Sequence, residues 1–571
     1  MIKHIFTTLM LVCCTLATFA QGSIPPKYEF RGVWVASVNN TDFPSKPGLS
    51  AEAQQQEWVN LLAQLRDLGL NAVVVQIRPS ADALYPSALV PWSKFLTGKQ
   101  GLPPSPYYDP LQFMVETAHS MGFEFHAWMN PYRVCAEADL ANLASNNVYR
   151  THPEWLKKYA GKYLLNPALP EVRQHLTDVV AEVVANYDVD AIHFDDYFYP
   201  YKVQGENFDD WQDFANLRGS YDNIEDWRRN NVDELIQKVS MRIKQIKPNV
   251  RLGISPFGVW RNNDRDPLGS DSRAGVTCYD DLYADVLKWM KLGWIDYVAP
   301  QLYWNIGFQA ADYEKLLHWW ANNSYYKQLY IGQGVYKVGT NKEAAWSLAS
   351  EIPDQIRLNR QSASNVQGSI FFNASSLLAN KLGVADSLSM ALFNVPAFPP
   401  YPRGAQNVLP ETPEFIRFKN RREGLEVRWE LSDANSVDAF ALYRFDGNVF
   451  GTTDDPRNIK AIIKPTDGVL STLDTSALQG QTYTYIVSSL SKQRVESMPS
   501  HPKTVRVGPV FPWRKKSIPA STTEPASIGF ASKGNTNVPV STAPSARKSK
   551  KSKGSKAKKE VVTPKPAPLF F

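Results

Sequence analysis

The chain has 571 residues, with 62 Lys and Arg against 56 Asp and Glu. A single hydrophobic core stops growing near ~250–300 residues, so this length excludes a one-domain protein. The net charge of +6 hides an uneven distribution, because 13 of the positive and two of the negative residues lie from Arg514 onward. The rest of the chain carries 49 positive and 54 negative residues, so a mildly acidic body precedes a basic tail.

The first twenty residues have the three parts of a secretory signal. Lys3 and His4 form a short positive region, an apolar stretch runs from residue 5 to 16, and Thr18-Phe19-Ala20 gives a small-x-small cleavage site. The apolar stretch is shorter than the ~20 residues that span a bilayer, and no later segment is apolar enough to do so. We therefore expect residues 1–20 to be removed from an exported, periplasmic or cell-surface protein.

Four cysteines are present, and two of them, Cys13 and Cys14, fall inside the signal, where neither follows the residues that lipidation needs. Cys135 and Cys278 remain. One interpretation is a disulfide between them, which could persist in an exported protein. The alternative is two separate buried thiols.

Short β-branched or aromatic runs alternate with amphipathic stretches through residues 28–395, which predicts a (β/α)8 barrel, an α/β fold. The predicted strands are Arg31–Val38, Asn71–Pro79, Glu124–Pro131, Asp190–Tyr199, Arg251–Gly258, Asp296–Trp304, Gln328–Tyr336 and Gln367–Asn373. The predicted helices are Ala51–Leu68, Pro110–Met121, Pro170–Asn186, Ile224–Ile246, Asp280–Leu292, Ala310–Asn322 and Lys342–Ile356.

Residues 396–411 are Pro-rich and predict a linker, after which the pattern changes to alternating strands over residues 412–508. Trp429, Tyr443 and Tyr485 in this stretch resemble the core tryptophan and tyrosine corner of a fibronectin type III sandwich. We expect this module to hold the barrel near its polymer or near another surface protein. Residues 512–571 are rich in Lys, Ser and Pro and predict a disordered tail.

Active sites of such barrels lie at the C-terminal ends of the strands, and these ends are unusually rich in polar and aromatic residues. Sugar rings pack on aromatic faces while amides and guanidinium groups bond the hydroxyls. We therefore predict a substrate-binding set of Trp34, Gln76, Arg78, Trp128, Asn130, Tyr132, His193, Tyr197, Gln301, Tyr303, Trp304 and Asn373. His193, like His126, fits a buried, hydrogen-bonded position equally well, and Trp128 and Trp304 fit rim packing.

The adjacent carboxylates Asp195 and Asp196 end the fourth strand, and two close carboxylates raise one pKa, as a general acid requires. Conventional glycosidases use two separated carboxylates, yet the ends of strands five to eight contain no Asp or Glu. Substrate-assisted enzymes replace the missing group with the sugar's own 2-acetamide, and the pair resembles that of family 84 N-acetylglucosaminidases. We predict that Asp195 orients the acetamide and Asp196 is the acid; the reverse assignment stays open, as does a mere capping or ion-pair role for the pair.

Four motifs in order carry a resemblance over residues 28 to 380. They are Phe30–Val35 (FRGVWV), Asn71–Pro79 (NAVVVQIRP), His126–Arg133 (HAWMNPYR) and His193–Pro200 (HFDDYFYP). The chain resembles the glycosyl hydrolase-like 10 family of exported bacterial proteins. The resemblance implies a barrel acting on cell-wall glycan, the peptidoglycan polymer, whose sugars both carry a 2-acetamide.

Two other functions remain open. One is a two-carboxylate glycosidase of another polysaccharide, with Glu206 or Asp210 as the second acid; the other is a non-catalytic carbohydrate-binding barrel. No residue spacing fits a metal site, and we expect neither metal nor cofactor. The basic tail favours an anionic cell-surface polymer or lipid head groups as a partner, or it merely solubilises, and its lack of interleaved aromatic residues argues against nucleic acid.

Overall fold

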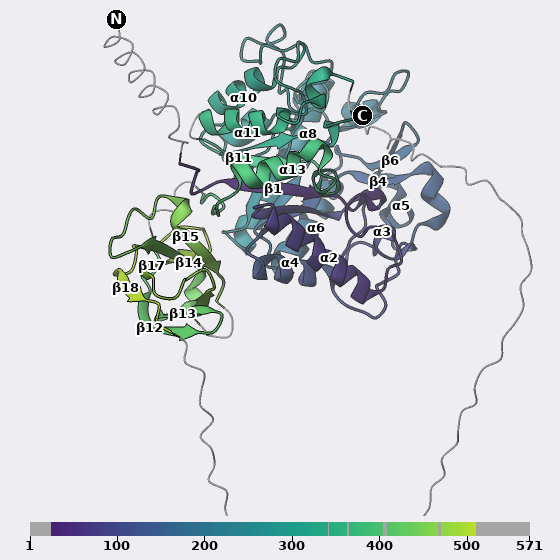
Figure 1. Cartoon of the computed structure of the whole chain (residues 1–571). Helices are drawn as coiled ribbons and strands as arrows, with labels where there is room; N and C mark the ends of the chain where they lie inside the picture. Colours follow the sequence, from purple (N-terminus) through teal and green to yellow (C-terminus); the bar gives the residue numbers. More distant parts are fainter. Residues whose placement is uncertain (1–23, 341, 363–364, 403–407, 466–469, 510–571) are drawn as a thin grey trace, which may run out of the picture. The chain divides into compact units, whose positions relative to one another are not determined.

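The computed structural model (Figure 1) describes residues 24–509, except for 341, 363–364, 403–407 and 466–469. The predicted signal peptide and basic tail lie outside these residues, and so do Cys13 and Cys14. The described residues all belong to the first of two compact units, residues 1–510. Among the described residues, no helix has the length and hydropathy to cross a membrane.

Eight parallel strands close into a barrel in the order β1-β11-β10-β9-β8-β7-β3-β2, which confirms the predicted fold. Strand β2 reads AVVVQIR and is buried throughout, as expected for a strand covered on both faces. Each observed strand begins within one residue of its predicted start, and all eight are shorter than predicted. The strands are β1 (Phe30–Val35), β2 (Ala72–Arg78), β3 (Glu124–Met129), β7 (Ala191–Phe194), β8 (Arg251–Ile254), β9 (Tyr297–Val298), β10 (Gln328–Gln333) and β11 (Val366–Phe371).

Helices follow the strands and carry their apolar side inward. The longer ones are α2 (Ala51–Asp67), α4 (Pro110–Ser120), α6 (Pro170–Asn186), α8 (Ile224–Ile246), α10 (Tyr313–Asn322) and α11 (Glu351–Gln361). Short helices are α3 (Lys94–Thr97), α5 (Val148–Thr151), α7 (Trp211–Leu217), α9 (Val286–Lys291), α12 (Ala374–Leu378) and α13 (Val384–Ser387).

One predicted helix, residues 342–356, was wrong in position. The observed helix α11 begins at Glu351 and runs to Gln361. Pro353 explains the shift, because proline lacks an N–H and is tolerated in the first turn of a helix but not in its interior. Likewise α9 begins only at Val286, where the Asp285 side chain accepts the Lys288 backbone N–H at 3.3 Å.

The loop after β3 forms a small antiparallel sheet that the sequence did not predict. Its strands are β4 (Arg133–Ala136), β5 (Leu156–Tyr159) and β6 (Lys162–Leu165). Cys135 lies in β4, and both Cys135 and Cys278 are buried free thiols, so they form no bridge.

Residues 414–506 form two antiparallel sheets. One contains β12 (Glu414–Arg421), β13 (Gly424–Glu430) and β16 (Ser471–Asp474); the other contains β15 (Ile459–Ile463), β14 (Val437–Asp446), β17 (Thr482–Ser491) and β18 (Lys503–Arg506). Trp429 and Tyr485 belong to the core between the sheets. Tyr443 faces the opposite way and packs in a separate cluster with Phe398, so the central strands β14 and β17 are buried on both faces.

Candidate active site

Asp195 follows β7 at the C-terminal end of the barrel and is anchored to strand β3. Its Oδ2 accepts the indole N–H of Trp128 at 3.2 Å and the side-chain amide N–H of Asn130. Its Oδ1 accepts the backbone N–H of Tyr197 at 3.3 Å. Only 5% of the residue is exposed. One oxygen is thus fixed by two neighbouring side chains, while the other has a single weak donor.

Asp196 has a different set of donors. The hydroxyl of Tyr201, five residues along the same loop, donates to its Oδ2, and the side chain of Gln301 after β9 adds a hydrogen bond. Gln301 also donates to the backbone oxygen of Ser255 at 2.9 Å, which places its amide between the ends of β8 and β9. The side-chain donors of Asp195 therefore come from the end of β3, on one side of β7, whereas Gln301 bonds Asp196 from the end of β9, on the other side.

Burial raises the pKa of both carboxylic acids. The pKa of Asp195 rises to about 7, first through loss of solvation and then through the charge of Asp196, against a smaller opposing effect of Arg133. Burial likewise raises the pKa of Asp196, while Tyr201 and Gln301 oppose the rise. Near neutral pH the pair therefore holds a transferable proton, as general acid–base catalysis requires.

A relay of amides orients Asn130 toward Asp195. Gln76 Oε1 accepts the backbone N–H groups of Ser37 and Val38 at 3.0 and 2.9 Å, so its Nε2 is left to donate to Asn130 Oδ1 at 2.6 Å. With its oxygen occupied, the Asn130 amide can only present its N–H groups to Asp195. Gln76 and Asn130 thus join the ends of β1, β2 and β3 to the carboxylate.

Other predicted binding residues are buried or bond partners other than the carboxylate pair. Arg78 is fully buried and donates from Nη1 to the backbone oxygens of Asn130 and Pro131 at 2.6 and 3.2 Å. Tyr132 is also buried, with 1% exposed. Asn373 donates to Asp42 Oδ1 at 2.8 Å.

Asp42 is a carboxylate at the barrel mouth that the sequence reasoning missed. It lies in the loop after β1 and also accepts the backbone N–H groups of Ala36 (2.7 Å) and Ser375 (2.8 Å). Burial raises its pKa despite these donors. Its hydrogen bonds join the loops after β1 and β11, and the single hint in the sequence was the polar run Asn39-Asn40-Thr41 before it.

Aromatic side chains surround the pair. Tyr197, Tyr303 and Trp304 are half-buried and present ring surface at the mouth, whereas Trp34 and Trp128 are 2% and 6% exposed and belong to the barrel interior. The guanidinium of Arg133 lies 5.0 Å from the ring centre of Tyr197.

Three further residues of this group went unpredicted. Tyr201, Tyr336 and Phe372 extend it, and the ring centre of Tyr303 lies 5.9 Å from that of Tyr336 and 5.8 Å from that of Phe372. The polar and aromatic strand ends could have indicated Tyr336 and Phe372, whereas nothing in the sequence shows that Tyr201 turns back to Asp196.

His193 lies beneath this layer, fully buried, and burial holds its pKa well below the ordinary value. It is a neutral interior residue, bonded to Trp34 and Tyr297. Among the residues with described side chains, no group of three or more His, Cys, Asp or Glu is arranged to hold a metal ion.

Residues 29–348 match the model of the glycosyl hydrolase-like 10 family. The chain belongs to this family. The protein is 43% identical to glycosyl hydrolase YngK of Bacillus subtilis (strain 168) over 480 residues, which cover 83% of this chain and 92% of that one. It is 39% identical to glycosyl hydrolase DigH of Escherichia coli (strain K12) over 405 residues, 64% of this chain and 91% of that one. The protein is accordingly a glycosyl hydrolase whose substrate is a glycan.

The PgaB (BpsB) glycoside hydrolase domain from Bordetella bronchiseptica aligns with 63% of this chain and 98% of its own length, at 12% identity and a TM-score of 0.43. This likeness is too weak to carry an argument.

Proposed function

We propose that this hydrolase is exported and cleaves an N-acetylated wall glycan, the peptidoglycan polymer, with the help of the substrate's own acetamide. The observation that carries the proposal is the adjacent pair Asp195–Asp196, with raised pKa values and separate donor sets. The segments after β8, β9, β10 and β11 place no acidic residue at the strand ends. A substrate that brings its own nucleophile needs only this pair.

In the proposed reaction the acetamide oxygen attacks the anomeric carbon and the bond to the leaving oxygen breaks. Asp195, fixed on one side by Trp128 and Asn130, accepts the acetamide N–H with its other oxygen and stabilises the positive charge that develops there. Asp196 transfers its proton to the leaving oxygen. Water then opens the bicyclic intermediate, its proton returns to Asp196, and the acetamide is regenerated.

The two-carboxylate alternative requires an acid that is free to reach the sugar. Asp210 is fully buried and forms a two-point ion pair with Arg228, at 2.9 Å to Nε and 2.5 Å to Nη2. Asp42 is held by three donors. Glu206 is exposed in the loop after β7 and stays the main competitor.

The deciding experiment compares the wild type with Asp195→Ala, Asp196→Ala and Glu206→Gln on peptide-free wall glycan and on neutral polysaccharides. We expect Asp195→Ala to abolish turnover and a thiazoline analogue of the intermediate to inhibit the wild type. Asp196→Ala should retain activity on an aryl N-acetylglucosaminide, whose leaving group needs no protonation. Loss of activity in Glu206→Gln with full activity in Asp195→Ala would favour the alternative, and binding without reducing ends would favour a non-catalytic barrel.

For the second module we propose a fibronectin type III-like sandwich. Its three-stranded and four-stranded sheets and its core Trp429 support this proposal. The hydroxyl of Tyr483 accepts the backbone N–H of Leu478 at 3.2 Å. The hydroxyl of Tyr485 instead donates to Asp474 Oδ2 at 2.8 Å. A tyrosine corner bonds the backbone a few residues upstream, so Tyr483 is the better candidate for it.

The basic tail is proposed to contact an anionic wall polymer or lipid head groups. Co-sedimentation of the chain with purified walls and with anionic vesicles, with and without residues 511–571, tests this. Amino-terminal sequencing of the protein from a bacterial host tests removal of residues 1–20.

A further inference from the structure

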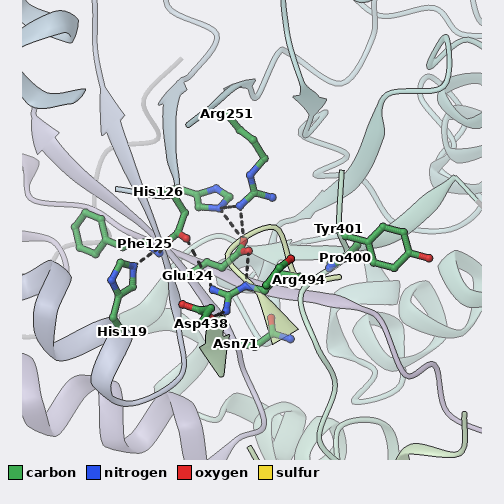
Figure 2. Close-up of polar contacts among 12 residues, drawn as sticks. Asn71, His119, Glu124, Phe125, His126, Arg251, Pro400, Tyr401, Asp438 and Arg494 are labelled. Carbon is green, nitrogen blue, oxygen red and sulfur yellow. Dashed lines mark hydrogen bonds and ion pairs between the residues drawn. The ribbon is translucent and has the colours of Figure 1, made fainter. Parts of the chain in front are cut away.

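Arg494 projects from the sandwich into the N-terminal end of the barrel (Figure 2). It lies in the turn after β17 and has a φ of +66°. Its backbone N–H donates to the backbone oxygen of Ser491 at 2.8 Å, and the backbone N–H of Ser491 donates to the backbone oxygen of Val495 at 2.9 Å. The side chain is 8% exposed. Arg494 thus adopts a backbone conformation that costs a non-glycine residue energy, at the point where its side chain enters the barrel.

Three carboxylates meet the guanidinium of Arg494. Its Nε donates to Glu124 Oε1 at 3.3 Å, its Nη2 lies 3.8 Å from Asp190 Oδ1, and its Nη1 pairs with Asp438. Arg251 bonds the other oxygen of Glu124 at 2.6 Å. Burial alone would raise the pKa of Glu124, yet the charge of Arg251, the hydrogen bond of His126 and the charge of Arg494 together bring it to about 2. Removing Arg494 would leave Glu124 with Arg251, Asp190 with His119 and Asp438 with Lys464, but it would take away the one cation that the three carboxylates share.

Glu124 begins a continuous line of hydrogen bonds through the barrel interior. Its Oε2 lies 3.2 Å from His126 Nε2, and His126 Nδ1 lies 2.9 Å from the hydroxyl of Tyr297. The same hydroxyl lies 2.8 Å from His193 Nδ1, and the indole N–H of Trp34 reaches His193 Nε2 at 3.3 Å. The line spans the barrel from its base to the layer below the catalytic pair.

The chemistry of the ends sets the direction of every proton in this line. An indole N–H only donates, so Nε2 of His193 accepts and its Nδ1 carries the proton that goes to Tyr297. The Tyr297 hydroxyl in turn donates a hydrogen bond to Nδ1 of His126, and the Nε2–H of His126 donates to Glu124. Arg251 also lies 3.2 Å from His126 Nε2, but if that nitrogen accepted, the Tyr297 proton would lose its acceptor within the line. Burial lowers the pKa of both histidines, which keeps the rings neutral.

The line ends directly under the active site. On β3 the inward residues alternate as Glu124, His126 and Trp128, and Trp128 donates to Asp195. Asp195 itself comes two residues after His193. The orientation of His126 and His193 therefore influences the positions of the residues directly above them, Trp34, Trp128 and Asp195.

We propose that Arg494 is a positioning residue of the active site, acting through Glu124, His126, Tyr297 and His193. By this inference the sandwich completes the catalytic unit, and its Arg494 contributes to turnover as well as to cohesion of the chain.

The test uses the full chain and compares Arg494→Ala, Arg494→Lys and Tyr297→Phe, singly and combined, with Gln493→Ala as control. Gln493 lies in the same turn and bonds the barrel through Asn249 at 2.8 Å, outside the line of hydrogen bonds. We expect Arg494→Ala to lower kcat about tenfold with KM nearly unchanged, Arg494→Lys to restore part of it, and Gln493→Ala to keep wild-type kcat.

Tyr297→Phe interrupts the line without removing the ring, and it separates positioning from plain stability. In a Tyr297→Phe background, adding Arg494→Ala should lower the melting temperature again but leave kcat where Tyr297→Phe put it. The proposal would be overturned if the losses of kcat in the two single variants multiplied in the double variant, or if Arg494→Ala left kcat unchanged. If Arg494→Ala does not fold, the comparison is made with Arg494→Lys.

Kinetics are measured on whichever of wall glycan and aryl N-acetylglucosaminide the wild type turns over. If the proposed substrate is wrong, the wild type itself is inactive on it. If the positioning role is wrong, the wild type is active and the variants do not differ from it as expected. A readout without substrate is the nitrogen-15 spectrum of the histidine rings. The proton should sit on Nδ1 of His193 and on Nε2 of His126, and the opposite tautomer in either ring would refute the inference.

Discussion

The indole of Trp128 donates to Asp195 Oδ2 across 3.2 Å, from the strand next to the one that Asp195 follows. A hydrogen bond to a buried carboxylate is stronger than one between neutral groups and favours the ionised form. Trp128 therefore helps to fix the direction in which Asp195 points, and it opposes the rise of the Asp195 pKa that burial and Asp196 cause.

Replacing Trp128 by Phe removes this donor while keeping an aromatic ring. The pKa of Asp195 should rise above about 7, so the acid limb of the kcat/KM profile should move to higher pH. A hydrogen bond to a charged group contributes about 1.5–3 kcal/mol, so we expect a loss of roughly tenfold or more in kcat/KM at neutral pH. Trp319→Phe, which loses an indole bond to the Leu268 backbone far along the chain, should leave the profile unchanged.

The amide relay predicts that Gln76→Glu acts at a distance. The carboxylate that this substitution introduces would have no N–H to give, so the Asn130 amide would turn its own N–H groups toward it and its oxygen toward Asp195. We expect Gln76→Glu and Asn130→Ala to lower kcat by similar factors, about tenfold to hundredfold. The double variant should lose no more than either one alone; independent, multiplying losses would refute the relay.

Asp195 should lower the free energy of unfolding at alkaline pH, where its buried carboxyl group is ionised. Its pKa is raised in the folded state, so its neutral form is favoured there, and this contribution is fully present below the unfolded pKa near 4 and lost as pH rises through about 7. Asp195→Asn should thus melt at a higher temperature than the wild type at pH 8, with the gap closing toward pH 4. Thermal denaturation across this range measures it, and Asp209→Asn, at an exposed position, should show no such trend.

Gly253 leaves no space for a side chain. A Cβ there would come 1.8 Å from Cζ of Tyr297, whose ring lies over the strand. Gly253→Ala should destabilise the barrel by about 1–3 kcal/mol or more, and displacing Tyr297 should also lower kcat. Chemical denaturation gives the first effect and steady-state kinetics the second; Gly253→Ala combined with Tyr297→Val should regain stability but not turnover. A stable and fully active Gly253→Ala would show that Tyr297 can move without consequence.

The fold could be predicted from the sequence because each barrel strand is a short buried run between amphipathic stretches. The position of Asp195 and Asp196 directly after a strand could be predicted for the same reason, and their catalytic role stays a prediction. The small sheet β4–β6 was missed because it lies within a loop, where hydrophobic periodicity is weak. Helix α11 begins later than its apolar spacing predicts because Pro353 must lie in the first turn of the helix.

The roles within the site depended on contacts between residues far apart in sequence. Gln76 and Asn130 are amides of the right type for hydroxyls of a sugar, yet in the fold they bond each other and the backbone. Arg494 gave no signal at all, because a turn arginine of a β-domain is ordinarily solvated, and only the packing of its turn on the barrel base shows its surroundings.

Closure of the barrel has a practical consequence at its seam, where β1 pairs with β11 in the register Phe30↔Gly368 to Val33↔Phe371. The family match ends at residue 348, before β11 begins. A fragment trimmed to the matched range would keep seven strands and expose the hydrogen-bonding edges of β1 and β10. Unpaired apolar edges of this kind recruit other chains, so such a fragment should aggregate, and its behaviour would say little about the hydrolase.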